Sequence, residues 1–172
     1  MGWEVKSILA LVSFVPFLFL PPLLHKLYGI RPEWAFVLWF IGSLLGVGLF
    51  MLYNEHSAQV IVGSIGVLLC AALLWVLREN IPTGIGNGHA IGLIAGFVFG
   101  TLANILFFQA MTESPNPVFP AAIVSVNVVL AALAAPLLAE LLPQVFPEAT
   151  LSWRQGIGIA LSPIVVWLIA IK

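Results

Sequence analysis

Six long apolar segments follow one another along the chain, and short polar connections separate them. A helix needs roughly 20 residues to cross a hydrocarbon core of about 30 Å, which is near the length of each segment. Backbone groups in lipid must be paired within their own segment, so apolar runs of this length are predicted to be helices. The predicted helices cover residues 7–24, 34–53, 59–78, 90–111, 118–141 and 153–171. The pattern therefore predicts an all-α fold, a polytopic transmembrane helix bundle of about six spans in a single membrane domain over residues 1–172.

The composition supports a membrane location. Hydrophobic residues make up 62% of the 172 residues and charged residues 8%, whereas soluble domains are about half apolar and about a quarter charged. A chain of this length cannot enclose so much apolar surface in one core, so we expect the lipid bilayer to cover it. The formal net charge of -1 gives no indication of a nucleic acid partner. Lys and Arg are slightly more frequent in the first, third and fifth connections, which favours a multi-pass cell-membrane protein with both termini outside.

Small side chains return at every fourth position in the fourth segment. One face of that predicted helix holds Gly92, Gly96, Gly100 and Asn104. The fifth segment repeats the pattern in the opposite order, with Asn127, Ala131, Ala135 and Ala139. Helices in lipid associate through close backbone approach and interhelical hydrogen bonds, so both faces are predicted to be helix-packing surfaces.

Four polar side chains of these two segments form the candidate substrate-binding site. If the segments are an antiparallel hairpin, Asn104 and Asn127 lie at similar depth and face each other. Gln109 and Ser125 add polar groups to the same hairpin. Polar groups at membrane depth are costly unless they are paired or hydrated. Two interpretations stay open: the four residues line a cavity, or the amides only pair inside a packing seam.

Two prolines interrupt predicted helices, Pro136 in the fifth segment and Pro163 in the sixth. Proline removes a helix hydrogen bond and kinks or breaks the helix. Carbonyl groups exposed at such breaks are typical of transporter binding sites. The sequence therefore predicts helix breaks at these positions, and a static kink is the alternative for each.

The residues that most enzymes need are missing. No predicted span carries Asp, Glu, Lys or Arg at its centre, and Cys70 is the only cysteine. The three histidines lie in separate connections, without the spacing of a metal site. We therefore expect no enzyme, no cofactor and no metal. A proton pump with a central carboxylate is also unsupported.

The last three segments resemble a known family. The stretches "GLIAGFVFGTLANILFFQAM", "PNPVFPAAIVSVNVVLAALAAPLLAE" and "LSWRQGIGIALSPIVVWLIAIK" are similar to the end of a repeat unit of the drug/metabolite transporter superfamily. The similarity rests on Ala110 near a helix end, a proline-led helix that ends at Glu140, and a helix that starts with Gly156-Ile157-Gly158. It covers about residues 90–172, and residues 1–80 match the family poorly.

The resemblance implies an EamA-like half-size unit of five helices, made by segments two to six, with segment one as an addition. Full-length members carry two such units in inverted orientation. The resemblance therefore implies that two chains pair, as a homodimer or as paired half-transporters. Small multidrug members use a glutamate in their first helix. No span here has a glutamate at its centre, so antiport by that mechanism is not implied.

Together, these patterns predict a half-size secondary transporter that moves a small neutral or zwitterionic metabolite by alternating access. Its expected partners are the lipid bilayer, the small-molecule substrate and a second copy or paired half. The alternatives are a non-transporting membrane subunit or scaffold, which uses the small-residue faces to hold a partner, and a flippase of the same fold for a lipid-linked substrate.

Overall fold

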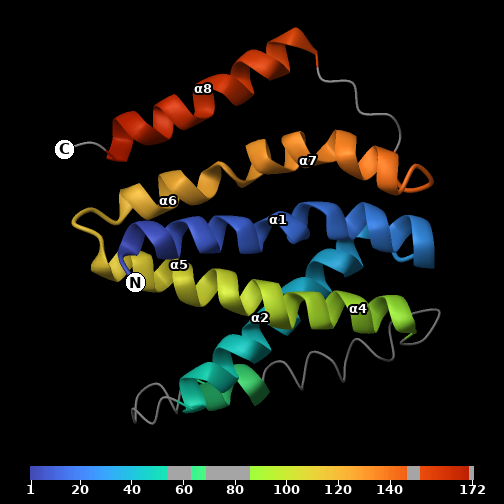
Figure 1. Ribbon diagram of the computed structural model, residues 1–172. Coiled ribbons are helices and arrows are strands. Elements are labelled where there is room, and N and C mark those ends of the chain that lie inside the picture. Colours follow the sequence, from blue (N-terminus) through green and yellow to red (C-terminus); the bar gives the residue numbers. More distant parts are fainter. Residues whose placement is uncertain (54–62, 69–85, 147–151, 171–172) are drawn as a thin grey trace. The chain divides into compact units, whose positions relative to one another are not determined.

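The computed structural model describes residues 1–53, 63–68, 86–146 and 152–170, and all regular secondary structure in these ranges is helical (Figure 1). The first two helices are α1 (Trp3–Tyr28) and α2 (Pro32–Tyr53). A third long helix has three parts in direct succession: α4 (Asn87–Ala95), the π-helical turn η1 (Gly96–Gly100) and α5 (Thr101–Glu113). The remaining helices are α6 (Val118–Ser125), α7 (Asn127–Leu141) and α8 (Trp153–Ala170). The predicted all-helical fold is confirmed for the described residues.

Four helices of the described part are long and apolar enough to cross a membrane: Trp3–Tyr28, Pro32–Tyr53, Asn87–Glu113 and Val118–Leu141. They correspond to four of the six predicted spans. The predicted span over residues 59–78 lies largely outside the described residues, and residues 63–68 within it are helical. The predicted span over residues 153–171 corresponds to α8. The structure therefore supports a helical membrane protein with four candidate spans among the described residues, and six spans stay a prediction.

A glycine sets the connection between α1 and α2. Gly29 has a φ of 67°, a left-handed conformation that favours glycine at the end of a helix. The N–H groups of Gly29 and Ile30 donate to the carbonyls of His25 and Leu24, and His25 Nδ1 donates to the carbonyl of Ile30 over 3.1 Å. Pro32 then starts α2, where its missing N–H leaves no helix bond unmade. These bonds make the turn short and closed.

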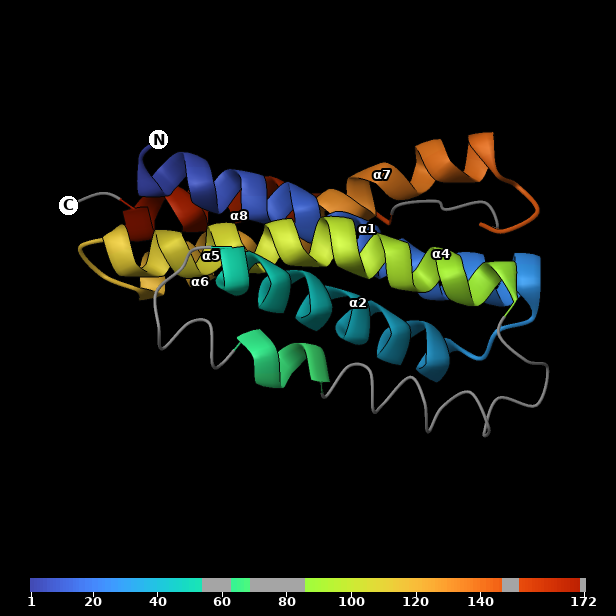
Figure 2. The same cartoon turned by 90° about the horizontal axis from the view of Figure 1, so that it is seen from below.

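The residues form two compact units, and each is described here by itself. One unit holds Leu20–Asn104, and the other holds Met1–Phe19 with Ile105–Lys172. The unit boundaries fall within α1 and within α5. In the unit Leu20–Asn104, α2 packs closely along α4 and η1 (Figure 2). Trp39 of α2 is its largest fully buried side chain.

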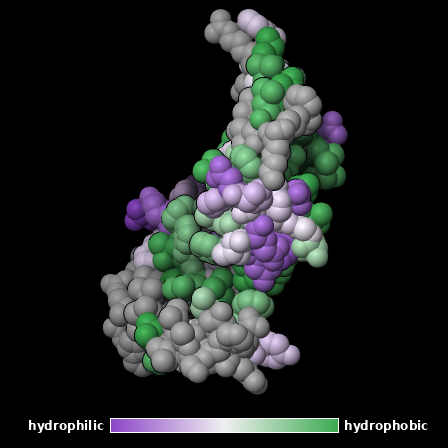
Figure 3. Space-filling view, turned by 90° about the vertical axis from the view of Figure 1, so that its left-hand side faces the viewer, coloured by the Kyte–Doolittle hydropathy of each residue, from purple (hydrophilic) through white to green (hydrophobic). Residues whose placement is uncertain are grey.

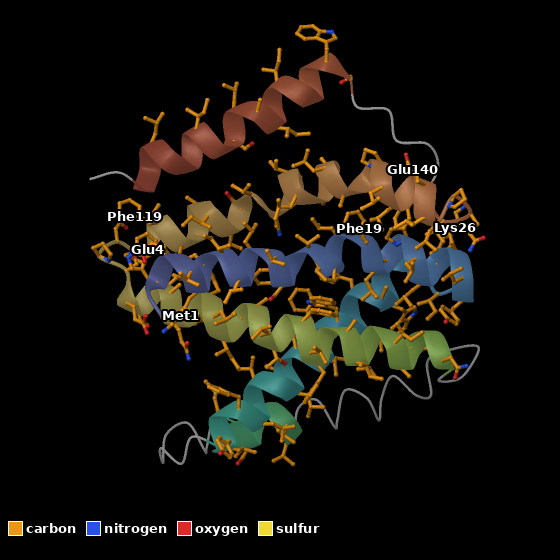
Figure 4. The ribbon with its side chains drawn as sticks, in the orientation of Figure 1. Met1, Glu4, Phe19, Lys26, Phe119 and Glu140 are labelled. Carbon is orange, nitrogen blue, oxygen red and sulfur yellow. The ribbon has the colours of Figure 1, made fainter. Side chains whose placement is uncertain are left out.

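The other unit is held together by contacts from α1. Lys6 forms an ion pair with Glu113 at the end of α5. The ring of Trp3 lies 6.1 Å from that of Phe119, at the start of α6. Figure 4 labels Phe119 close to Glu4, in the first turn of α1. Further along α1, the ring of Phe19 meets that of Phe146 edge-on at 5.8 Å. α8 packs against α6 and α7 within the same unit.

Large hydrophobic side chains are exposed on every described helix of span length. On the face drawn in Figure 3, they reach the surface beside a group of hydrophilic residues. Phe36 and Phe40 of α2 are 46% and 51% exposed, although the opposite face of the same helix is buried. An apolar outer face combined with a small-residue inner face is typical of a helix that packs on protein at one side and on lipid at the other.

Candidate functional site

The glycine face of the long helix Asn87–Glu113 packs directly on the backbone of α2. A Cβ atom added to Gly96 would lie 2.2 Å from the carbonyl oxygen of Trp39. One added to Gly42 of α2 would lie 2.2 Å from the carbonyl oxygen of Leu93. At Gly100 the added atom would lie 2.7 Å from Cβ of Ser43. Only glycine permits this approach, so the two helices form a seam in which backbone meets backbone.

The π-helical turn keeps that face aligned. Each residue of an α-helix turns by about 100°, so each step of four drifts by about 40° and Asn104 would lie about 120° around the helix from Gly92. A π turn accommodates one extra residue, which reduces this drift to about 20°. A Cβ added to Gly92 would meet Leu38, and one added to Gly96 would meet the next residue, Trp39. One added to Gly100 would meet Ser43, one turn after Trp39 along α2. The turn therefore brings the whole series against one strip of α2.

Asn104 ends the series inside a polar cluster. Its Nδ2 donates to Oγ of Ser43 over 2.9 Å and to the carbonyl oxygen of Gly100 over 2.8 Å. A carbonyl oxygen can only accept, so the amide atom beside Gly100 must be the nitrogen. Thr101 Oγ1 donates to the carbonyl oxygen of Ser43 at 3.4 Å. Ser43 itself is buried, with 4% of its surface exposed.

The carboxamide of Asn104 is thus held by its nitrogen, and its oxygen Oδ1 accepts no hydrogen bond from the described residues. Both Nδ2 hydrogens are used, and none of the described residues donates to Oδ1. Asn104 is half-buried. Asn104 belongs to a helix of span length and carries no charge. An acceptor in a membrane-spanning helix needs a donor, and none of the described residues supplies one to Oδ1.

The partner of the glycine face differs from the one expected. The sequence placed the fifth segment, with Asn127, opposite this face, whereas the structure places α2 there. The four-residue spacing identifies which residues share a face, but it carries no information on which helix covers that face. The second segment has its own small residues, Gly42 and Gly46, on the side that meets α4 and η1. The seam is therefore complementary between these two helices.

The other predicted site residues belong to the second unit. Ser125 is exposed, and its Oγ donates to the carbonyl of Ala122 over 2.6 Å, so its hydroxyl proton is used within α6. Gln109 and Asn127 are half-buried, and the described residues offer no partner to either side-chain amide.

The fifth segment is interrupted at a residue where the sequence predicted no break, and the predicted break at Pro136 is absent, which leaves the static kink as the open alternative there. α7 stays helical on both sides of Pro136, and α8 stays helical on both sides of Pro163. The helix is interrupted at Val126 instead, where the N–H donates to the carbonyl of Ile123 and separates α6 from α7. Ile, Val and Ser crowd this position, and β-branched residues are stiff in helices. The alanines that follow, Ala131, Ala135 and Ala139, are half-buried.

Sequence reasoning missed Ser43, which is the residue that holds Asn104. A signal was available, because Ser43 lies beside Gly42 and one turn before Gly46 in an apolar segment. A hydroxyl next to a close-contact face is well placed to bond across it. Among the described residues, no group of three His, Cys, Asp or Glu side chains could hold a metal ion.

Comparison with known proteins gives no match to a family model, a curated protein or a solved structure.

Proposed function

We propose that the protein is a membrane transporter of small neutral or zwitterionic solutes, in which the side-chain amide oxygen Oδ1 of Asn104 accepts a hydrogen bond from the solute. The observation that carries the proposal is the orientation of this amide. Its nitrogen is bound to Ser43 and Gly100, and its oxygen has no donor among the described residues.

The chemistry of the surroundings favours an uncharged donor on the solute. The described cluster of Ser43, Thr101 and Asn104 contains two hydroxyls and one amide and no carboxylate. A permanent cation would need a counter-charge to leave water, whereas a hydroxyl or amide needs only an acceptor. We therefore expect solutes that carry hydroxyl or amide groups. Following the resemblance noted above, two chains pair to complete the pathway in a cell membrane, with both termini outside.

The test uses purified protein in liposomes and a panel of neutral and zwitterionic solutes. We expect counterflow of at least one solute, and an affinity about tenfold weaker in Asn104→Ala, because one hydrogen bond contributes roughly 1 to 1.5 kcal/mol. Ser43→Ala is the comparison variant, since it removes one of the two bonds to Nδ2 and keeps the acceptor Oδ1, so we expect a smaller loss of affinity. Absence of binding and of flux across the panel would overturn the proposal.

A membrane scaffold is the second candidate, and one observation favours it. α7 has no buried residue, and its alanine series Ala131, Ala135 and Ala139 is only half-buried. Close-packing faces of this kind are suited to a partner helix. A single heterologous protein that purifies with the chain in native lipid, and that Ala135→Leu releases, would support the scaffold over the transporter.

A further inference from the structure

The π-helical turn is a single irregularity within a helix of 27 residues. The N–H of Thr101 donates to the carbonyl of Gly96, five residues earlier, while α4 before the turn and α5 after it are α-helical. Such a turn is an α-helix that holds one residue more than the regular geometry requires. The number of backbone hydrogen bonds in the helix is the same wherever the extra residue lies. Its position along the helix can therefore change.

Both ends of this helix are held, each within its own unit. At the start of α4, a Cβ on Gly88 would lie 2.6 Å from Ile30 and 2.7 Å from Tyr28, so that the turn after α1 presses on the backbone. At the end of α5, Glu113 forms its ion pair with Lys6. The helix keeps one extra residue wherever that residue lies, so the first and last turns of the helix keep the same rotation about its axis. If its extra residue moves, only the residues between the old and the new position turn.

The residues that turn would include Asn104. With the extra residue at Gly96–Gly100, Asn104 lies about 20° around the helix from Gly92, on the face that meets α2. With the extra residue beyond Asn104, the same side chain lies about 120° away. Ala103 then takes the direction that Asn104 has now, because it precedes Asn104 by one residue. The Asn104 amide leaves Ser43, and a methyl group replaces it.

We propose that the π turn at Gly96–Gly100 is a conformational device whose extra residue migrates past Asn104, so that the Asn104 amide is alternately presented at the α2 seam and withdrawn from it. The two states keep the ends of the helix in place. The structure describes the presented state, which the bonds from Asn104 to Ser43 and Gly100 stabilise. The use of this motion in solute movement rests on the proposed function, whereas the motion itself does not.

Two deletions of the same residue type separate the states. Phe99 lies inside the π turn and Phe108 beyond Asn104, and they are 42% and 60% exposed. Deletion of Phe99 removes the extra residue where it now is, so the helix becomes regular and Asn104 keeps its direction. Deletion of Phe108 makes the helix regular only if the extra residue moves past Asn104, which leaves Asn104 withdrawn. The two products have equal length and composition.

The experiment measures thiol cross-linking in membranes, in a chain where Cys70→Ser has removed the native thiol. One reporter pair is Ser43→Cys with Asn104→Cys, and the other is Ser43→Cys with Ala103→Cys. In the undeleted chain we expect the 43/104 pair to cross-link rapidly with a short thiol reagent and the 43/103 pair to cross-link slowly. Deletion of Phe99 should keep the first product and abolish the second. Deletion of Phe108 should reverse the two yields.

The proposal is overturned if the 43/103 pair never cross-links in the undeleted chain while the 43/104 pair does, because the extra residue is then stationary. It is also overturned if the chain without Phe108 keeps the 43/104 product, since the deletion is then absorbed further along α5. Where a deletion variant fails to fold, the undeleted chain still decides the question. Cross-linking requires no solute, so these outcomes are independent of whether any flux is found.

Discussion

Gly96→Ala is the most informative single substitution, because it adds one methyl group where two backbones meet. The new Cβ would lie 2.2 Å from the carbonyl oxygen of Trp39 and 2.7 Å from its C and Cα atoms. These are backbone atoms, so no change of rotamer can make room. Ordinary contact begins near 3.4 Å. The two helices must therefore separate by about 1 Å at this crossing.

The separation has a cost that can be estimated in two parts. Overpacking of a tight contact destabilises a protein by roughly 1 to 3 kcal/mol. The opened seam also stretches the bond between Asn104 and Ser43, and interhelical hydrogen bonds in membranes contribute about 0.6 to 1.7 kcal/mol each. We expect Gly96→Ala to lower the free energy of unfolding by about 2 to 4 kcal/mol. This is a large part of the stability of an ordinary domain.

Gly92→Ala supplies the matched control in the same helix, one turn earlier. Its Cβ would meet side-chain atoms only, at 3.2 Å from Leu38 and 3.3 Å from Leu24. Leucine side chains can give by a few tenths of an ångström, so we expect a change within about 1 kcal/mol of zero. Equilibrium unfolding in mixed micelles, followed by circular dichroism, measures both variants. If Gly96→Ala unfolds at the same denaturant fraction as Gly92→Ala, the close crossing of α2 and η1 is wrong.

Three further outcomes follow from other contacts. Ser43→Ala should destabilise the protein by about 1 kcal/mol, measured by the same unfolding assay, and the double variant with Asn104→Ala should lose less than the sum of the two single changes, since the bond between Asn104 and Ser43 is lost in each; additive losses would contradict a shared bond. Glu113→Gln should cost less than about 1 kcal/mol because the carboxylate is half-exposed, and high salt should shrink its effect; an effect independent of salt would argue against an ion pair with Lys6. Gly158→Ala should be neutral or stabilising by up to about 1 kcal/mol in a thermal melt, since nothing lies within 4 Å of the added methyl group; a clear loss of stability would place a neighbour there.

The extent of the helices could be predicted from the sequence, because apolar length is a local property. The predicted segment 34–53 and the helix Pro32–Tyr53 differ by two residues at one end only. The segment 118–141 matches the ends of α6 and α7, and the fourth segment is longer than predicted, from Asn87 to Glu113. Proline and β-branched residues act on helix geometry in ways that depend on neighbours, so the break at Val126 was predicted at Pro136 instead.

Pairing between helices could be predicted only in part. The spacing of Gly92, Gly96 and Gly100 marks one face as a packing surface, whatever helix lies opposite. Choosing between α2 and the fifth segment needs the shape of both partners, and Gly42 beside Ser43 gives α2 a matching surface. The π turn could not be predicted, since no residue type requires it. Its consequence is that Asn104 stays near the face that the glycines define, whereas a regular helix would turn it away.

The orientation of the Asn104 amide separates the two functional candidates more sharply than the glycine face does. A glycine seam serves equally in a transporter and in a scaffold, because it only brings helices together. A scaffold would be more stable with leucine or alanine at position 104, since an acceptor without a donor is costly in a dry seam. The amide does bind Ser43 and Gly100. An alcohol or a second small residue at position 104 could also complete the seam, without an acceptor that receives no hydrogen bond from the described residues. A donor that comes and goes, such as the water or solute of the proposed transporter, would account for an Oδ1 that accepts from none of the described residues.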